Sequence, residues 1–194
     1  MPVAELLRRG LVRPIVRWGA PVLHHSARPV TDFGAELQAL LADMFATNTA
    51  AHGAGLAARQ IGVDLAAFIY DCADEHGARR TGLVCNPTVE VAVGADRRLV
   101  DSGEGCLSLP GAYADLARPA VATCRGSDQY GVPVVITAGG TLRRCLQHET
   151  DHINGMVFGD RLSSRVRQRL CRDHDDVADL YPSDWPVTEA VDAD

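Results

Sequence analysis

The sequence predicts an α+β domain in which mostly antiparallel strands pack around a central helix that carries an H-E-x-x-H motif. Three observations support this class. A helical pattern near the N-terminus is followed by short apolar runs rich in β-branched residues, and two further helical segments follow those runs. No internal repeat or long linker divides the 194 residues, a length that suits one domain with a full hydrophobic core.

The first helix follows a cap at Thr31 or Asp32. It ends before residues 52–55, where two glycines break the helical pattern. Between these limits the apolar residues recur at the spacing of one helical face: Leu37, Leu40, Leu41, Met44 and Phe45.

Strands are predicted next, over residues 65–71 and 83–93, because both runs are apolar and rich in β-branched side chains. Pro87 should interrupt the second strand or place it at an edge, since proline cannot donate to a strand ladder. A hairpin is predicted over residues 120–137, with its turn at residues 127–131.

Two helices complete the predicted fold. The first covers residues 141–154 and stops at Gly155, because glycine favours the end of a helix. The second begins at Ser163 or Ser164 and runs toward Val177.

Composition narrows the class of protein. Apolar residues make up 46% and charged residues 23% of a chain with net charge −6, so general affinity for nucleic acid or membrane is not indicated. No run approaches the roughly 20 apolar residues of a membrane helix, and the N-terminus lacks a secretory signal. The six cysteines include no C-x-x-C pair. We therefore expect free thiols and a cytoplasmic location, with no disulfides and no membrane partner.

The segment QHETDHING at residues 147–155 contains the metal-ligand and acid–base side chains of the predicted helix. Residues four apart lie on one helical face with Cβ atoms about 6 Å apart, so His148 and His152 could bind one metal ion. Glu149 lies one step round the helix, where it could contact a water on that metal without binding the ion. The alternative is an ordinary helix with two exposed histidines and a salt-bridging glutamate.

A catalytic metal site usually has three protein ligands and one open position. No downstream residue has a compelling position among the candidates Asp160, Asp173, His174, Asp175 and Asp176. Upstream, Cys106 lies in a turn-like segment, DSGEGCLSLPG, and could complete a His-His-Cys set. The alternative for Cys106 is a buried structural thiol.

A third segment, GAGLAARQ at residues 53–60, follows the first helix. Its glycines allow the backbone to pass close to another group, and Gln60 supplies an uncharged donor. The alternative is a helix end followed by a core strand.

Together the three segments resemble the peptide deformylase family, which carries G-x-G-L-A-A-x-Q, E-G-C-L-S and Q-H-E-x-D-H in this order. The chain has GAGLAARQ, EGCLS and QHETDH, and the resemblance extends from about Ile15 to Leu162. Two positions depart from the usual pattern: Arg59 stands where many members have proline, and Ile153 where leucine is usual. The residues before Pro14 and the acidic tail match nothing in the family.

The resemblance implies a role for each matching residue. Cys106, His148 and His152 would bind the metal, and Glu149 would be the catalytic acid and base. The side-chain amide of Gln60 and the backbone N–H of Leu107 would contact the substrate carbonyl oxygen, and Gly55 would line the same pocket. The cofactor would be one divalent metal ion, Fe(2+) by family likeness, although this ligand set also suits Zn(2+), Ni(2+) or Co(2+).

The implied reaction is removal of the formyl group from the formyl-methionine of newly made polypeptides, in co-translational N-terminal processing. A metal-activated water would attack the formamide and give formate and a free amino terminus. The main alternative is a zincin-type metallopeptidase using the same H-E-x-x-H, which leaves EGCLS and GAGLAARQ unexplained. A hydrolase with Cys106 as nucleophile and a non-catalytic binding module are two further alternatives.

Neighbours of the predicted ligands also carry expectations. Asp151 would orient a ligating imidazole or lie on a solvated helix face, and Glu104 would pair with Arg118. The expected organisation is an N-terminal extension (residues 1–14), a single catalytic metallohydrolase domain (residues 15–180) and an acidic, poorly ordered tail (residues 181–194).

The last predicted helix suggests a partner besides the formyl-methionyl nascent peptide. Arg165, Arg169 and Arg172 share one helical face, whereas Arg167 points away. One hypothesis is weak contact with the RNA phosphate of the ribosome, where nascent chains emerge. The alternative is a solvated helix face.

Overall fold

The computed structural model describes residues 1–188. Its helices and strands are segregated along the chain instead of alternating. The seven strands follow one another almost without interruption between the second and third helices. The helices are α1 Val3–Leu6, α2 Ala35–Ala50, α3 Gly140–Ile153 and α4 Ser164–Asp175; the strands are β1 Gly55–Ala57, β2 Ala67–Ala73, β3 Arg79–Val91, β4 Leu99–Cys106, β5 Leu109–Pro119, β6 Ala122–Ser127 and β7 Pro133–Ala138.

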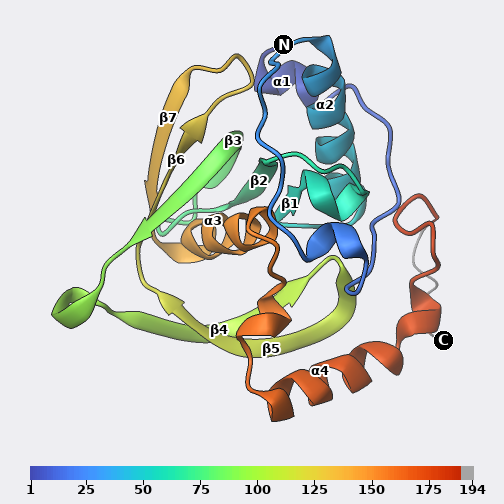
Figure 1. Cartoon of the computed structure of the whole chain (residues 1–194), viewed down its shortest axis with the longest axis vertical. Coiled ribbons are helices and arrows are strands. Elements are labelled where there is room, and N and C mark those ends of the chain that lie inside the picture. The colour runs from blue at the N-terminus through green and yellow to red at the C-terminus, as the bar shows by residue number, and fades with distance from the viewer. Residues whose placement is uncertain (189–194) are drawn as a thin grey trace.

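The strands form two antiparallel sheets. Five strands pair in the order β1-β2-β3-β6-β7, and β4 pairs with β5 in a separate ribbon. Helix α3 lies between the five-stranded sheet and this ribbon, α2 lies beyond the β1 end of the sheet, and α4 packs on β5 (Figure 1). The predicted α+β class with antiparallel sheets is confirmed.

Helix α3 is held in place by its apolar side. Leu142, Leu146 and Ile153 are almost fully buried in one cluster with Phe68 and Val84 of the sheet. Burying each such side chain contributes about 1.5–3 kcal/mol, so the helix is fixed on the sheet by several contacts of this size. Its other side therefore faces the β4–β5 ribbon, and the polar residues of the motif are directed there.

Most element predictions agree with the structure. The first helix begins after Gly34, however, and Asp32 accepts a hydrogen bond from the Gly34 N–H at 2.8 Å instead of capping the helix itself. The hairpin β6–β7 is present, and Pro87 lies in an irregularity of the β3–β6 pairing, between Cys85 and Thr88. There the ladder can omit the N–H that proline lacks.

The segment predicted to be turn-like around Cys106 is a tight hairpin: residues 107–108 form its turn, and the strands on either side were not predicted. Cys106 ends strand β4, whose residues pair with β5 from Leu99 onward. Gly103, Gly105 and the exposed side chains of β4 remove the alternation of apolar and polar residues by which a strand is recognised. The ribbon is specified by its contacts with the rest of the fold more than by its own composition.

Both ends of the described chain pack against the domain. Leu6 of the N-terminal extension is fully buried beside α2, and Trp185 is 6% exposed in the same apolar cluster, with Tyr181 against it. The prediction of a poorly ordered tail is therefore wrong for its first residues, from residue 181 to 188. There the rings of Tyr181 and Trp185 bury enough apolar surface to order the segment. Residues 189–194 of that prediction lie outside the described residues.

All six cysteines lie within the described residues and are free thiols. No helix in residues 1–188 combines the length and apolarity needed to cross a bilayer.

Candidate metal centre and catalytic cavity

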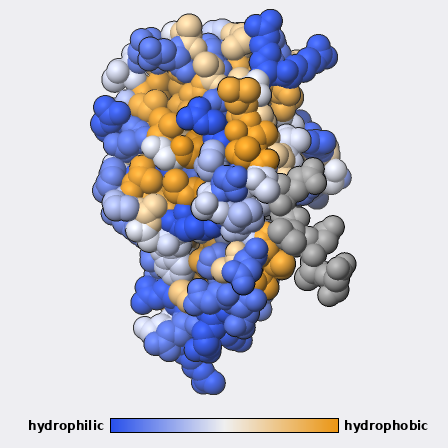
Figure 2. Space-filling view, turned by 90° about the vertical axis from the view of Figure 1, so that its right-hand side faces the viewer, coloured by the Kyte–Doolittle hydropathy of each residue, from blue (hydrophilic) through white to orange (hydrophobic). Residues whose placement is uncertain are grey.

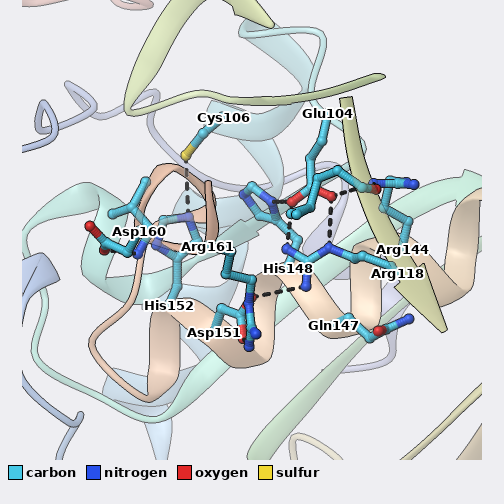
Figure 3. Close-up of polar contacts among 12 residues, drawn as sticks. Glu104, Cys106, Arg118, Arg144, Gln147, His148, Asp151, His152, Asp160 and Arg161 are labelled. Atoms are coloured by element: carbon cyan, nitrogen blue, oxygen red, sulfur yellow. Dashed lines mark hydrogen bonds and ion pairs between the residues drawn. The ribbon is translucent and has the colours of Figure 1, made fainter. Parts of the chain in front are cut away.

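The end of β4 and the middle of α3 bring three ligand-type side chains together. Cys106, His148 and His152 are buried, and one ligand atom from each lies within 4.8 Å of the others. The Cys106 Sγ lies 3.3 Å from Nε2 of His152 (Figure 3), and the two imidazole rings have centroids 5.0 Å apart. One thiol and two imidazoles at this spacing form a donor set that fits a single divalent transition-metal ion.

The alternative of two exposed histidines is excluded by burial. His152 is fully buried and His148 is 8% exposed. Lone buried imidazoles are costly unless they have partners, and Nδ1 of His152 has no hydrogen-bond partner among the described residues. The opposite nitrogen of His152, Nε2, faces the Cys106 thiol, on the side where an ion shared with His148 would bind.

Glu104 of β4 orients the other imidazole. Nδ1 of His148 lies 2.7 Å from Oε1 of Glu104, so this nitrogen donates to the carboxylate, and in the neutral ring Nε2 is then a free acceptor. The same carboxylate accepts hydrogen bonds from Arg118 at 2.5 and 2.7 Å and from Arg144 at 2.6 Å. The expected Glu104–Arg118 pair is confirmed, and it belongs to a larger buried network (Figure 3).

The network controls charge near the cluster. Burial alone would raise the pKa of Glu104, but hydrogen bonds from Arg118 and His148 hold that pKa well below its usual range. Burial lowers the pKa of His148, and hydrogen bonding to Cys106 and Glu104 outweighs burial and raises it. Glu104 is therefore ionised, and its charge fixes the ring of His148.

Among the described residues Asp151 has no hydrogen bond to either imidazole, so its expected role in orienting a ligand directly is wrong. It accepts hydrogen bonds from Arg118 at 3.0 Å and from Arg161 at 2.6 Å. Asp151 is 5% exposed, so it is not a solvated residue either. Its place on α3 directs the carboxylate toward the arginines that hold the network, one step away from the ligand face.

Glu149 occupies a very different environment from Glu104. It is 3% exposed, and its Oε2 has no hydrogen-bond partner among residues 1–188. Burial raises its pKa to about 7, and the nearby charge of His148 opposes this shift. A carboxyl group with such a pKa can both accept and release a proton near neutral pH.

Glu104, Cys106, His148 and Glu149 line a cavity of about 330 Å³. Gly55 lies at its base, where an added Cβ would come within 2.8 Å of Oε1 of Glu149 and 2.6 Å of Sγ of Cys145. Only glycine allows this approach of strand β1 to α3. Gln60 and Leu107 line the same cavity, and Nε2 of Gln60 lies 3.6 Å from Sγ of Cys106. Six of the seven predicted site residues therefore line one cavity, and His152 adjoins it through its contact with Cys106.

Two features of the site were not predicted. Arg59 is fully buried and donates hydrogen bonds to the backbone oxygens of Val22 and His25, which ties that turn to the segment bearing Gln60. Its position gave no signal beyond the departure from proline. Tyr181 and Trp185 also line the cavity, and in the sequence they were part of the tail.

Comparisons with known proteins agree with this geometry. The family model described as polypeptide deformylase matches residues 12–168. Peptide deformylase 1 of Streptomyces avermitilis is 52% identical over 179 residues, covering 92% of this chain and 83% of the relative. Peptide deformylase 2 of Streptomyces coelicolor is 47% identical over 163 residues, covering 84% of this chain and 89% of the relative.

Solved structures show the same fold. A peptide deformylase from Legionella pneumophila has a TM-score of 0.75 at 38% identity, covering 86% of this chain and 95% of its own. A peptide deformylase from Synechococcus elongatus in complex with actinonin has a TM-score of 0.75 at 33% identity, covering 87% and 92%.

The fold and these matches place the protein in the class of metal-dependent amide hydrolases. Within that class, the chain belongs to the peptide deformylase family. The resemblance carried by its three motifs is confirmed.

Glu104→Gln should lower the free energy of unfolding by about 3–5 kcal/mol, because it removes a counter-charge of the buried Arg118 and of the half-buried Arg144. Urea denaturation followed by circular dichroism measures this loss. Glu90→Gln is the matched control, since Glu90 forms an exposed ion pair with Arg125 and such pairs contribute about 0–1 kcal/mol. Equal losses in the two variants would contradict a stabilising role of the buried network.

Proposed function

We propose that this deformylase removes the formyl group from the N-terminal formyl-methionine of newly made polypeptides. The reaction consumes one water and gives formate and a free amino terminus. The observation that carries the proposal is the buried Cys106, His148 and His152 cluster, with the unpartnered carboxyl of Glu149 beside it in one cavity. The family match supports deformylation as the activity.

In this proposal α3 is the metal-binding helix, and Cys106, His148 and His152 hold one divalent ion. We propose Fe(2+) on family likeness, because thiolate and imidazole ligands equally suit Zn(2+), Ni(2+) and Co(2+). When bound, such an ion lowers the pKa of water and polarises a carbonyl oxygen. Glu104 keeps His148 in the tautomer that leaves Nε2 free for the ion.

The remaining steps belong to side chains and backbone around the cavity. Glu149 takes a proton from the attacking water and delivers it to the departing amine nitrogen, as its raised pKa allows. The side-chain amide of Gln60 and the backbone N–H of Leu107 donate to the formyl oxygen as it gains charge. Each such donor is typically worth about 10²–10³ in turnover.

The zincin-type metallopeptidase is not favoured. Zincins usually take their third ligand from downstream of the motif, and here the side chain that joins the two histidines comes from β4, upstream. The matches to deformylases over most of the chain also weigh against it. We further propose that residues 15–180 act as one catalytic metallohydrolase domain preceded by the extension of residues 1–14, and that the protein works in the cytoplasm, where its substrates are made.

Contact with the ribosome is a separate proposal about α4. Arg165, Arg169 and Arg172 are exposed, whereas Arg167 is half-buried and lies 3.9 Å from Asp160. Leu170 is fully buried against β5, so α4 is held with its three arginines outward. The lower end of the molecule, which α4 forms, has a hydrophilic surface (Figure 2). Three outward cations on a fixed helix support weak, salt-dependent binding to RNA phosphate.

Glu149→Ala should keep its metal and lose about 10²-fold or more in turnover, because the proton-transfer group is removed while all three ligands remain. Elemental analysis gives the metal content, and release of formate from a formyl-methionyl peptide gives the rate. Turnover above about a tenth of wild type would contradict the acid–base role.

Cys106→Ala should lower the metal content sharply, because the site loses its only thiolate. The matched control is Cys85→Ala, which removes a fully buried thiol outside the cluster and should leave metal content unchanged. Full occupancy in Cys106→Ala would place the third ligand elsewhere. Chelation of the wild type, followed by recovery on adding Fe(2+), would exclude Cys106 as a metal-independent nucleophile.

Changing Arg165, Arg169 and Arg172 together to glutamate should abolish co-sedimentation with ribosomes at low salt, while hydrolysis of free formyl-methionyl peptides continues. The control makes the same charge change at three other exposed arginines: Arg8, Arg97 and Arg98. Co-sedimentation of the α4 variant at the wild-type level would show that α4 is only a solvated helix.

A further inference from the structure

The chain beyond α4 turns back toward the catalytic cavity. We call residues 176–188 the C-terminal segment; it begins where α4 ends and runs along the right-hand side of the molecule in Figure 1. Two of its aromatic residues, Tyr181 and Trp185, line the same cavity as Gln60, Cys106 and Leu107. The segment lies outside residues 12–168, the part that matches the family model, so family membership alone does not account for it.

The C-terminal segment is fixed to the first residues of the domain. The Ile15 N–H donates to the backbone oxygen of Trp185 at 2.9 Å. Arg17 donates to the backbone oxygens of Tyr181 at 3.2 Å and Pro182 at 3.1 Å, and its guanidinium carbon lies 5.5 Å from the centre of a Trp185 ring. The segment therefore has a defined position over the cavity, held by hydrogen bonds and a cation–π contact.

Strand β5 is shaped to receive these aromatic rings. Gly111 has a φ of 79°, and an added Cβ there would lie 2.6 Å from Val177 and 3.0 Å from the ring of Tyr181. His174, near the end of α4, is hydrogen-bonded through Nδ1 to the backbone oxygen of Pro110 at 2.8 Å. A glycine that is needed both for its φ and for space shows that the contact is built into the fold.

The two rings differ in how much surface they offer. Trp185 is 6% exposed and packs against Tyr181 edge-on, with ring centroids 5.2 Å apart. Tyr181 is only half-buried. On β5, Tyr113 lines the same cavity and is 69% exposed. Tyr181, supported by Trp185, thus presents an aromatic surface on the wall of the cavity.

We propose that Tyr181, backed by Trp185, is a specificity-determining wall that contacts the peptide beyond its formyl-methionine and favours apolar or aromatic side chains there. This inference rests on the proposed function. A cavity of about 330 Å³ is in the range that encloses a drug-sized ligand, so it holds more of the substrate than the formamide alone. An aromatic surface stabilises apolar side chains and offers little to hydrated polar ones.

The test compares kcat/KM for formyl-Met-Phe-Phe-amide and formyl-Met-Ser-Ser-amide. Wild type should prefer the phenylalanine peptide, and Tyr181→Ala should reduce that preference about tenfold, the size expected for a lost hydrophobic contact. The loss should appear in KM, and Tyr181→Phe should restore the preference because it keeps the ring. Tyr130→Ala is the matched control, since Tyr130 is exposed in the β6–β7 turn, outside the cavity.

The possible results distinguish failure of the proposed Tyr181 wall from failure of the proposed deformylase activity. If wild type and Tyr181→Ala prefer the phenylalanine peptide over the serine peptide to the same extent, the proposed wall is wrong. Formate release would still support deformylation in that case. An equal fall in kcat for both peptides, with KM unchanged, also overturns the wall, because that pattern indicates a structural role. If metal-loaded wild type releases no formate from either peptide, the proposed function fails, and the wall fails with it. Arg17→Met, which removes the guanidinium contacts that position Tyr181 and Trp185 without changing a ring, should reproduce part of the loss of preference.

Discussion

The carboxylate of Glu104 is the interaction on which the site depends. It lies on β4 and accepts hydrogen bonds from Arg118 of β5 and from Arg144 and His148 of α3. Burying a carboxylate costs several kcal/mol unless its oxygens are fully hydrogen-bonded. The network is therefore stable only with the ribbon and the helix at one separation, and that separation brings Cys106 to the two histidines.

The same region holds two carboxyl groups in opposite states. Glu104 is surrounded by cations and stays ionised, whereas Glu149 has an unpartnered oxygen and a pKa raised to about 7. When the surroundings of two carboxyl groups push their pKa values apart, one stays ionised and serves the structure, and the other can exchange a proton. Hydrogen bonds to the ionised form would lower the pKa of Glu149, so the burial of this carboxyl among few donors is consistent with the acid–base role proposed for it.

The sequence predicted the site better than the scaffold around it. Helical spacing placed His148, His152 and Glu149, because the period of a helix is a local property. The position of Cys106 came from a motif, and its strand was missed because glycine and exposed residues hide the β pattern. The partners of Asp151 and the packing of Trp185 depend on segments far apart in the chain, and no local pattern records such contacts.

Arg59 shows how a departure from a family pattern can still serve the same site. Its guanidinium is fully buried, and the carboxylate of Asp64 lies 4.0 Å away, too far for a hydrogen bond. Backbone oxygens of Val22 and His25 satisfy it instead. Burial is the largest cause that lowers the pKa of His152, and the charge of Arg59 lowers it further. A histidine must be neutral to bind a metal, so a buried cation that disfavours protonation of His152 is consistent with the metal site proposed above.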